Sequence, residues 1–505
     1  MPIANLNHLL YNGKTNTHSG GVLMKKIIAL LLVGVITIAL VGCGSSGREV
    51  VQLTLSTEDA AAILAAAGIK LPDASETAAA GTVVKWFSWY DDLQNYSDDE
   101  IINSGYWTFQ EKYDCSVKWV ECTWGTRFDE LATLILSSES PDFYPGHDDI
   151  FPSKCLKGMF VPVDDYIDYD DPLWAGERDY AYNYYSIQGR PYVIVYDNTY
   201  DNIVVYNRRV MNELGYEDPA ELFYNDEWTW DVFYEMCVDF TDPDEDMYAL
   251  DGWYYSLALM HSCGESIVTY NTETQQFESN IDSPAIERAA SLLYDLSKNS
   301  CLYPVWDHDW STREGNGIKQ GLCLFYFGYS TIIWGTVDVI STNWGDVTEG
   351  EVMFVPLPRD DDGDGNYYTE SIPTGYAIIQ GAKNPEGVAL LAACMRFKVV
   401  DPTVVSLDRR QLEETYLWTE EMLDMYDTCY ALSTASNVIV TYGEGYGDKL
   451  YTVTDALERF AVQSDASTWA SLKEAYGEQV EYWVAKLNED IASYDPYSAS
   501  GYVGG

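Results

Sequence analysis

The apolar positions of this chain switch repeatedly between two spacings, that of buried strands and that of amphipathic helices. Residues 82–90, Thr-Val-Val-Lys-Trp-Phe-Ser-Trp-Tyr, form an almost continuous apolar run that predicts a buried strand. From Phe128 to Ile135, apolar residues recur at i, i+3, i+4 and i+7, which is one face of a helix. We expect that helix to stop at Ser140, because a residue before proline is pushed out of the helical region.

The rest of the chain alternates in the same way, with capping residues marking the helix starts. The pattern predicts a strand at 203–206 and helices at 207–215, at 384–396 and at 468–494. It also predicts a helix capped by Thr229, with Phe240 on its apolar face, and one that starts at Ser283, with Leu293 on its apolar face. Strands that alternate with helices indicate an α/β fold with a mainly parallel sheet.

The N-terminal region has a different composition. Residues 44–81 are rich in Ala, Ser, Thr and Glu and predict a flexible tether with one short helix at 58–67. Before them, Met24-Lys25-Lys26 precedes an apolar run that ends at Val41-Gly42-Cys43. The run of 15 residues from Ile27 to Val41 is shorter than the ~20 that a membrane-spanning helix needs. Residues 1–23 have no apolar core of their own, so we expect Met24 to be the true start.

The segment around Cys43 resembles a bacterial lipoprotein signal. That resemblance implies that the Cys43 thiol carries a diacylglycerol and that cleavage before Cys43 leaves it as the new N-terminus. It also implies a location on the extracellular face of the cell membrane.

Composition excludes several classes of function. Asp and Glu number 80 against 29 Lys and Arg, giving a net charge of −51, so nucleic acid is not a partner and charge alone does not dock the protein on an anionic membrane. The acids are spread along the chain, which indicates a solvated surface. After Cys43 only three histidines remain, so the chain offers few residues from which a zinc site or a histidine triad could be built. Nine further cysteines form no C-x-x-C motif.

Several segments, in this order, resemble the extracellular solute-binding proteins of sugar-type ABC transporters, the family that includes maltose-binding protein. The matching pieces are the strand at 86–90, the helix ending in Ser-Pro-Asp-Phe at 140–143, Gly158–Tyr166, Gly189–Tyr192 with Val205–Arg208, Trp228–Phe233, Phe354–Pro358, and Pro373–Ile378 leading to Glu386. The resemblance covers residues 82 to about 400. Gly321–Leu324 and the sequence Val-Ile-Val-Tyr at 193–196 depart from the family pattern.

The resemblance implies an α/β, two-lobed periplasmic-binding-protein-like fold of class II, with crossing strands as the hinge between the lobes. The expected organisation is an upstream extension and signal at 1–43 and the tether at 44–81. Lobe 1 is expected at 82–198 with 366–410, and lobe 2 at 199–365 with 411–505. Tyr206 and Asn207 are expected to serve the hinge and the fold.

The resemblance also implies a function: a lipid-anchored receptor that captures a carbohydrate, in particular an oligosaccharide, and delivers it to the permease subunits of an ABC transporter, with no catalysis. Aromatic platforms suit the apolar faces of a sugar, and polar side chains suit its hydroxyls. The expected ligand-binding residues lie at strand ends and in the loops that follow: Trp89, Tyr90, His147, Asp148, Trp253, Tyr254, Tyr329, Trp334 and Tyr376.

Two alternatives stay open at this point. A cell-surface glycosidase would need two carboxylates about 5–10 Å apart across a sugar, and a chain with 80 acids can supply such a pair. A ligand-sensing receptor that contacts a membrane kinase would have the same fold.

An acidic loop is the one candidate cofactor site. Asp360, Asp362 and Asp364 match the first three ligand positions of an EF-hand-like Ca²⁺ loop, with Gly365 next. Position 12, where the motif requires a bidentate Glu, is Ser371. A solvated acidic turn is therefore the preferred interpretation, and no other cofactor is expected.

Overall fold

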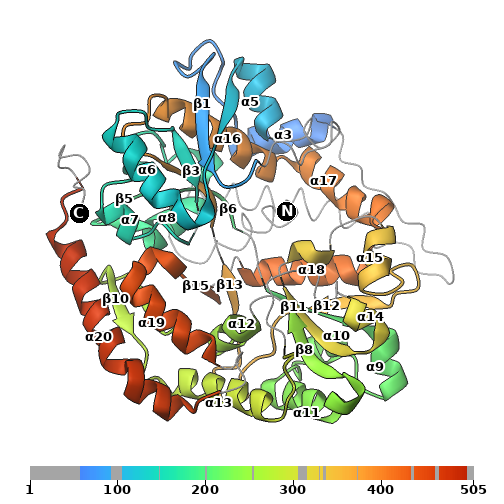
Figure 1. Cartoon of the computed structure of the whole chain (residues 1–505). Helices are drawn as coiled ribbons and strands as arrows, with labels where there is room; N and C mark the ends of the chain where they lie inside the picture. Colours follow the sequence, from blue (N-terminus) through green and yellow to red (C-terminus); the bar gives the residue numbers. More distant parts are fainter. Residues whose placement is uncertain are drawn as a thin grey trace, which may run out of the picture.

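The computed structural model describes residues 57–91, 105–146, 148–198, 202–252, 255–304, 316–328, 330–333, 337–371, 373–433, 437–460 and 466–496. Within them the chain forms two lobes, each built on its own sheet, and a C-terminal segment (residues 437–496) that packs against both (Figure 1).

Lobe 1 is built on a five-stranded sheet in the order β2-β1-β3-β14-β6. Its strands are β1 (Val83–Ser88), β2 (Ser116–Glu121), β3 (Phe143–Pro145), β6 (Ile194–Asn198) and β14 (Pro373–Ile378). The helix α16 (Pro385–Val400) covers it and packs against β6, β14 and α5 (Gly105–Tyr113). Most of α16 is buried, because apolar residues occupy nearly its whole circumference.

Lobe 2 is built on a four-stranded sheet in the order β12-β7-β11-β8. Its strands are β7 (Ile203–Asn207), β8 (Tyr248–Gly252), β11 (Cys323–Gly328) and β12 (Val352–Val355). Strands β7, β11 and β12 are buried at every position, which fits their uninterrupted Val, Ile and Phe content. Figure 1 places this sheet at the lower right, away from the sheet of lobe 1.

Most strands of each sheet run in one direction, as expected, but one strand in each lobe, β14 and β7, is reversed. In lobe 1, β1 pairs in parallel with β2 and β3, but β14 pairs antiparallel with β3 and β6. In lobe 2 only β11 and β8 pair in parallel. The cause is the connection between lobes, because a strand that returns from the other lobe enters the sheet in the opposite direction.

The crossing between the lobes depends on one close backbone approach. A Cβ on Gly375 of β14 would lie 2.4 Å from the carbonyl oxygen of Ile194 in β6, and the register of the two strands shifts beside it. Only glycine permits this approach. On the lobe 2 side, Asn207 ends β7 and caps the helix α9 (Arg208–Leu214) by accepting a hydrogen bond from the backbone N–H of Val210.

The C-terminal segment joins the two lobes. Its long helix α20 (Trp469–Ser493) packs against α13 (Pro284–Lys298) and β10 (Gln276–Ser279) of lobe 2, and also against α7 (Ser153–Leu156) of lobe 1. Figure 1 shows α20 along one side of the molecule, from lobe 1 to the far end of lobe 2.

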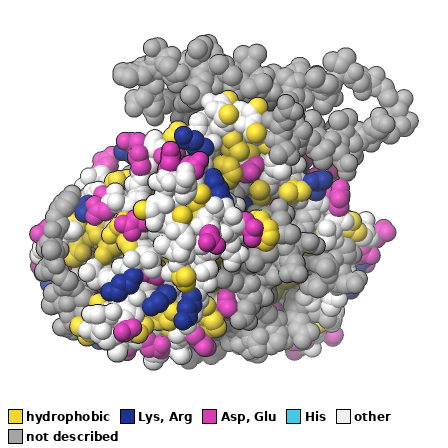
Figure 2. Space-filling model, turned by 90° about the horizontal axis from the view of Figure 1, so that it is seen from above, with side chains coloured by type: hydrophobic (Ala, Val, Ile, Leu, Met, Phe, Trp, Pro, Cys, Tyr) yellow, Lys and Arg dark blue, Asp and Glu magenta, His cyan; other side chains and the backbone are white. Residues whose placement is uncertain are grey.

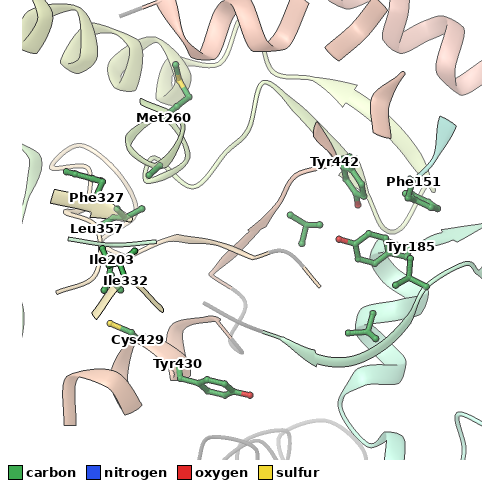
Figure 3. Packing of buried hydrophobic residues seen from close by; sticks show 14 of the residues in the cluster. Phe151, Tyr185, Ile203, Met260, Phe327, Ile332, Leu357, Cys429, Tyr430 and Tyr442 are labelled. Atoms are coloured by element: carbon green, nitrogen blue, oxygen red, sulfur yellow. The ribbon is translucent and has the colours of Figure 1, made fainter. Parts of the chain in front are cut away.

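Buried aromatic rings form the joint between lobe 1 and the C-terminal segment. Tyr442 lies 5.6 Å from Phe151 and 5.8 Å from Tyr185, measured between ring centroids, and its hydroxyl donates to the carbonyl of Tyr184. Figure 3 shows these rings together, apart from the lobe 2 group around Phe327. Aromatic contacts of this kind add stability beyond the area they bury.

The remaining helices follow the sequence pattern closely. The helix predicted at 58–67 is α3 (Thr57–Ala67), and those predicted from Thr229, Ser283 and Asn384 are α11 (Trp230–Phe240), α13 and α16. Two helix ends are wrong: α6 (Arg127–Leu136) ends four residues before Ser140, where Ser138 adopts a positive φ of 61°, and α16 continues four residues beyond the predicted end at 396.

The other elements connect these layers. They are η2 (Trp124–Thr126), η3 (Pro172–Trp174), α8 (Glu177–Tyr184), β4 (Ser186–Ile187), β5 (Arg190–Pro191), α10 (Pro219–Tyr224), η4 (Pro243–Glu245), α12 (Tyr255–His261), β9 (Val268–Asn271), α14 (Asn316–Gln320), η5 (Ser330–Ile333), α15 (Val337–Asn343), β13 (Thr369–Ser371), α17 (Pro402–Arg410), η6 (Gln411–Thr415), α18 (Glu420–Ser433), β15 (Val438–Val440), η7 (Gly443–Tyr446) and α19 (Asp448–Glu458).

The surface and the cysteines fit the composition. On the face shown in Figure 2, Asp and Glu side chains are scattered, with Lys and Arg among them. All nine cysteines of the described residues are buried free thiols. Within the same residues, no helix combines the length and the apolar character needed to cross a membrane.

Candidate functional site

A polar cavity of about 140 Å³ lies where lobe 1, lobe 2 and the C-terminal segment meet. Lobe 1 contributes Trp124 and the turn at 148–149, and lobe 2 contributes Leu257 of α12. The segments between the lobes contribute Asn202 and Glu370, and residues 441–459 close the remaining side. The cavity is therefore formed by parts of the chain that are far apart in sequence.

Exposed aromatic residues stand at the end of strand β1, on the lobe 1 side. Trp89 follows β1 and makes an edge contact with Trp124, with ring centroids 4.5 Å apart. Tyr90 packs edge-on against Trp86 and stays 38% exposed, while Trp124 is 39% exposed. Rings held in place yet open to solvent are suited to stack on the apolar face of a ligand.

A buried arginine holds this wall together. Arg127 is 3% exposed; its Nε lies 2.8 Å from Asp149 and its Nη2 lies 2.6 Å from Glu444. Its guanidinium carbon lies 3.6 Å from the centroid of the Trp124 ring, a cation–π contact that fixes the ring. Burial lowers the pKa of Arg127, but the charge of Asp149 and its other partners raise it overall, so the side chain stays charged.

The same wall is tied to the C-terminal segment through a glycine. The backbone N–H of Gly445 donates to the carbonyl of Asp148, and a Cβ at Gly445 would lie 2.2 Å from the carbonyl oxygen of Phe151. This close fit leaves no room for a side chain. The ion pair between Arg127 and Glu444 bridges the same two parts of the molecule.

Behind the opposite wall, a buried histidine lies between two of the lining carboxylates. His261, at the end of α12, is fully buried, with Nδ1 3.5 Å from Glu370 and Nε2 4.0 Å from Glu458. Burial alone would lower the pKa of His261, but the charges of Glu370 and Glu458 raise it above its ordinary value. Burial raises the pKa of Glu458 to about 7, with a further contribution from the charge of Glu370.

Glu370 is positioned by short polar contacts. The Thr441 hydroxyl donates to its Oε1 over 2.5 Å, and Nδ2 of Asn202 donates to its Oε2 over 3.3 Å. Asn202 is 3% exposed, and its Oδ1 accepts no hydrogen bond from any described residue. A buried acceptor of this kind lacks a donor that a ligand can provide.

The structure brings three of the predicted ligand-binding residues to this region. Asp148 lines the cavity, and Trp89 and Tyr90 belong to the aromatic group beside it. His147, Trp253, Tyr254, Tyr329, Trp334 and the predicted lipidation residue Cys43 lie outside the described residues.

Tyr376 lies elsewhere. It is 3% exposed within lobe 1, where its ring contacts Phe143 and Tyr196 and its hydroxyl lies 3.2 Å from that of Tyr106. The structure thus places this residue of β14 in the core of lobe 1. Its role in binding stays a prediction.

In the acidic loop at 360–365, two carboxylates already interact with other side chains or backbone groups of the protein. Asp360 is 5% exposed and pairs with Arg288 over 2.5 Å, which the interpretation as a fully solvated turn does not anticipate. Asp364 accepts hydrogen bonds from Asn366 and Tyr368, and Asp362 is exposed. Among the described residues, no group of three His, Cys, Asp or Glu side chains is placed to hold a metal ion. Calcium binding at Asp360, Asp362 and Asp364 therefore stays a prediction.

Sequence reasoning missed most of the cavity wall. Glu370, Glu458 and His261 come from β13, α19 and α12 and meet only in the folded chain. The position of Trp124 could have indicated a binding residue, because it lies in the loop between the strand after Tyr113 and the amphipathic helix α6. Nothing in the sequence distinguishes Glu458 from the other acids.

Two lobes joined by crossing strands around a polar cavity are the architecture of proteins that close over a ligand. The comparisons agree. The family described as bacterial extracellular solute-binding protein matches residues 63–398, and this chain belongs to that family. Its members bind solutes outside the cytoplasm, and the fold is the two-lobed α/β fold expected from the sequence.

Solved structures show the same fold at low sequence identity. The GacH receptor of Streptomyces glaucescens, solved unliganded and with acarbose, is 13% identical, with a TM-score of 0.54 over 82% of this chain and 99% of its own. The galacto-N-biose-/lacto-N-biose I-binding protein of Bifidobacterium longum is 13% identical, with a TM-score of 0.56 over 81% and 99%. A cyclo/maltodextrin-binding protein with maltotetraose is 15% identical, with a TM-score of 0.53 over 81% and 98%. No curated protein matches the chain in sequence.

Proposed function

We propose that this protein is a lipid-anchored extracellular receptor that captures a carbohydrate between its lobes and delivers it to an ABC permease. The observation that carries the proposal is the cavity at the meeting of the two lobes, with the exposed rings of Tyr90 and Trp124 beside a wall of acceptor groups. Rings take the C–H faces of a sugar, and carboxylates and amide oxygens accept from its hydroxyls.

The solved relatives support a sugar as the ligand. These structures were solved in complex with acarbose, maltotetraose and lacto-N-biose, all bound by proteins of the same two-lobed fold. The family is one of binding proteins, which favours capture over hydrolysis. The acids Glu370 and Glu458 flank an imidazole, and in this proposal they hold a ligand without cleaving it.

A ligand screen tests the proposal. Thermal unfolding is measured with maltotetraose, lacto-N-biose, acarbose and other oligosaccharides, and a true ligand at 100 times its Kd stabilises the folded state by about 2.7 kcal/mol. Chromatography of the recovered sugar should show it unchanged. A screen in which no carbohydrate stabilises the protein, or in which the sugar is cleaved, contradicts the proposal.

The lipid anchor has its own test. Cys43→Ser removes the thiol that would carry the diacylglycerol, so the protein should lose its membrane fraction or remain unprocessed. Cys115→Ser, at a buried cysteine of the folded part, is the matched control and should stay membrane-bound. An unchanged size and membrane fraction in Cys43→Ser would contradict the anchor.

A further inference from the structure

The described wall of the cavity is strongly acidic. Six of its lining residues are carboxylates, and Arg459 is the one Lys or Arg among them. The acids are Asp148, Asp149, Glu370, Glu444, Asp455 and Glu458. A site for a neutral ligand does not require such an excess of one charge.

Cations within the protein neutralise Asp149, Glu444 and Asp455. Arg127 pairs with Asp149 and Glu444, and Arg459 pairs with Asp455 one helical turn away. Glu370 and Glu458 share the single imidazole of His261, at the longer distances of 3.5 and 4.0 Å. Charges in a partly buried site interact more strongly than in water, so this pair retains an attraction for a further cation.

A second observation points to a donor at the same place. Asn202 lines the cavity, is 3% exposed and gives its Nδ2 hydrogen to Glu370, while its Oδ1 has no donor among the described residues. The missing partner must donate a hydrogen bond. A group that has positive charge and several N–H donors meets both requirements.

We propose that the ligand of this cavity carries an ammonium group, which docks against the cavity-facing sides of Glu370 and Glu458, beside Asn202. The inference rests on the proposed receptor function and specifies its ligand class. The described residues offer no group of three ligands for a metal ion, which favours an organic cation. With a volume of about 140 Å³ the cavity takes one end of a ligand, since complete ligand sites measure about 300–1,000 Å³.

An ammonium group can come from an amino sugar or from a polyamine, and the test separates these sources. Isothermal titration at pH 7 compares the β-1,4-linked disaccharide of glucosamine with cellobiose, its neutral counterpart, and with spermidine. We expect the charged disaccharide to bind at least tenfold more tightly than cellobiose. Tight binding of spermidine alone would keep the ammonium inference and overturn the carbohydrate receptor.

Variants locate the ammonium group. Glu458→Gln keeps the size of the side chain and removes its charge, so the loss of affinity should be at least tenfold larger for the charged disaccharide than for cellobiose. Glu481→Gln, on the exposed face of α20, is the matched control and should change neither. Equal losses for both sugars would show that Glu458 acts through packing and would overturn the assignment.

Proton release gives a readout independent of affinity. Glu458 faces His261, Glu370, Asp455 and Arg459, and a bound cation should lower its pKa from about 7. Titrations at pH 6.5 in buffers of different ionisation enthalpy should therefore show protons released on binding, and none in Glu458→Gln. If neutral sugars bind as well as the charged one and no protons are released, the ammonium inference fails while the receptor function stands. If no probe binds, both fail.

Discussion

The two walls of the cavity carry similar charges in very different arrangements. On the lobe 1 wall, Arg127 lies 2.8 Å from Asp149 and 2.6 Å from Glu444, and the Tyr144 hydroxyl donates to Asp149 over 2.7 Å. On the opposite wall, His261 lies 3.5 and 4.0 Å from its two carboxylates, and neither ring nitrogen makes a hydrogen bond within the described residues.

This difference separates scaffold from binding surface. Short, charge-assisted hydrogen bonds hold the lobe 1 wall in one geometry whether or not a ligand is present. The His261 wall keeps carboxylates and an amide oxygen whose interactions are incomplete, and incomplete buried groups gain most from a ligand. Loss of the buried ion pairs of Arg127 in the first wall should therefore affect folding, and loss from the second should affect protonation and binding.

The largest expected effect comes from the first wall. Arg127→Met keeps the length of the side chain but leaves Asp149 buried without its cation, so the free energy of unfolding should fall by about 3–5 kcal/mol. Urea unfolding measures it. Arg178→Met is the control, because Arg178 is 52% exposed and its ion pairs are long, so the change should stay within about 0.5 kcal/mol. Equal changes in the free energy of unfolding for Arg127→Met and Arg178→Met would contradict the role of Arg127 in holding the lobe 1 wall together.

The second wall should control the pH dependence of stability. The pKa of Glu458 is about 7 in the folded protein and near 4.5 when unfolded, so the folded state binds more protons between these values. Its stability must then fall as the pH rises from 4.5 to 7. His261 acts in the same direction, because a raised pKa gives stability at low pH that is lost as the pH rises.

Glu458→Gln should remove most of this dependence. Relative to the parent protein, the variant should gain roughly 3 kcal/mol between pH 4.5 and 7.5, measured by urea unfolding at intervals of one pH unit. The comparison with the parent cancels the general repulsion of a chain with a charge of −51. Glu481→Gln should follow the parent at every pH. A Glu458→Gln variant with the parent's slope would show that Glu458 titrates normally.

The aromatic residues should separate binding from folding. Trp124→Ala should weaken a stacked sugar by about 1–2 kcal/mol of binding free energy and change the free energy of unfolding less, since Trp124 is 39% exposed. Trp86→Ala is the contrast: Trp86 is 2% exposed in β1, and its loss should reduce stability by about 3–5 kcal/mol. Titration and urea unfolding of both variants measure the two effects. A Trp124→Ala variant that unfolds easily and binds normally would place Trp124 in the core.

Local patterns in the sequence predicted the elements well and their assembly less well. The cap and proline at Ser283-Pro284 place the start of α13 correctly, because capping depends on neighbouring residues alone. The antiparallel entry of β14 was not predicted, because strand direction depends on which lobe the chain comes from. Likewise, Asp148 could be predicted as a binding residue because it lies in the loop after a strand. Glu458 lies on a helix more than 300 residues further along the chain, and only the folded structure brings it to the same cavity.

The smallest expected effect concerns the acidic loop. Asp360 is already neutralised by Arg288, Asp364 accepts from Tyr368 and Asn366, and Asp362 is exposed, so EDTA should shift the free energy of unfolding by less than about 0.5 kcal/mol. Asp362→Asn should behave like the parent with and without Ca²⁺ in thermal unfolding. Because a Ca²⁺ ion needs six or more oxygen ligands, the carboxylates of Asp360 and Asp364 would have to leave their present partners to bind one. A large EDTA-induced loss that Ca²⁺ restores, and that Asp362→Asn abolishes, would show that this rearrangement occurs.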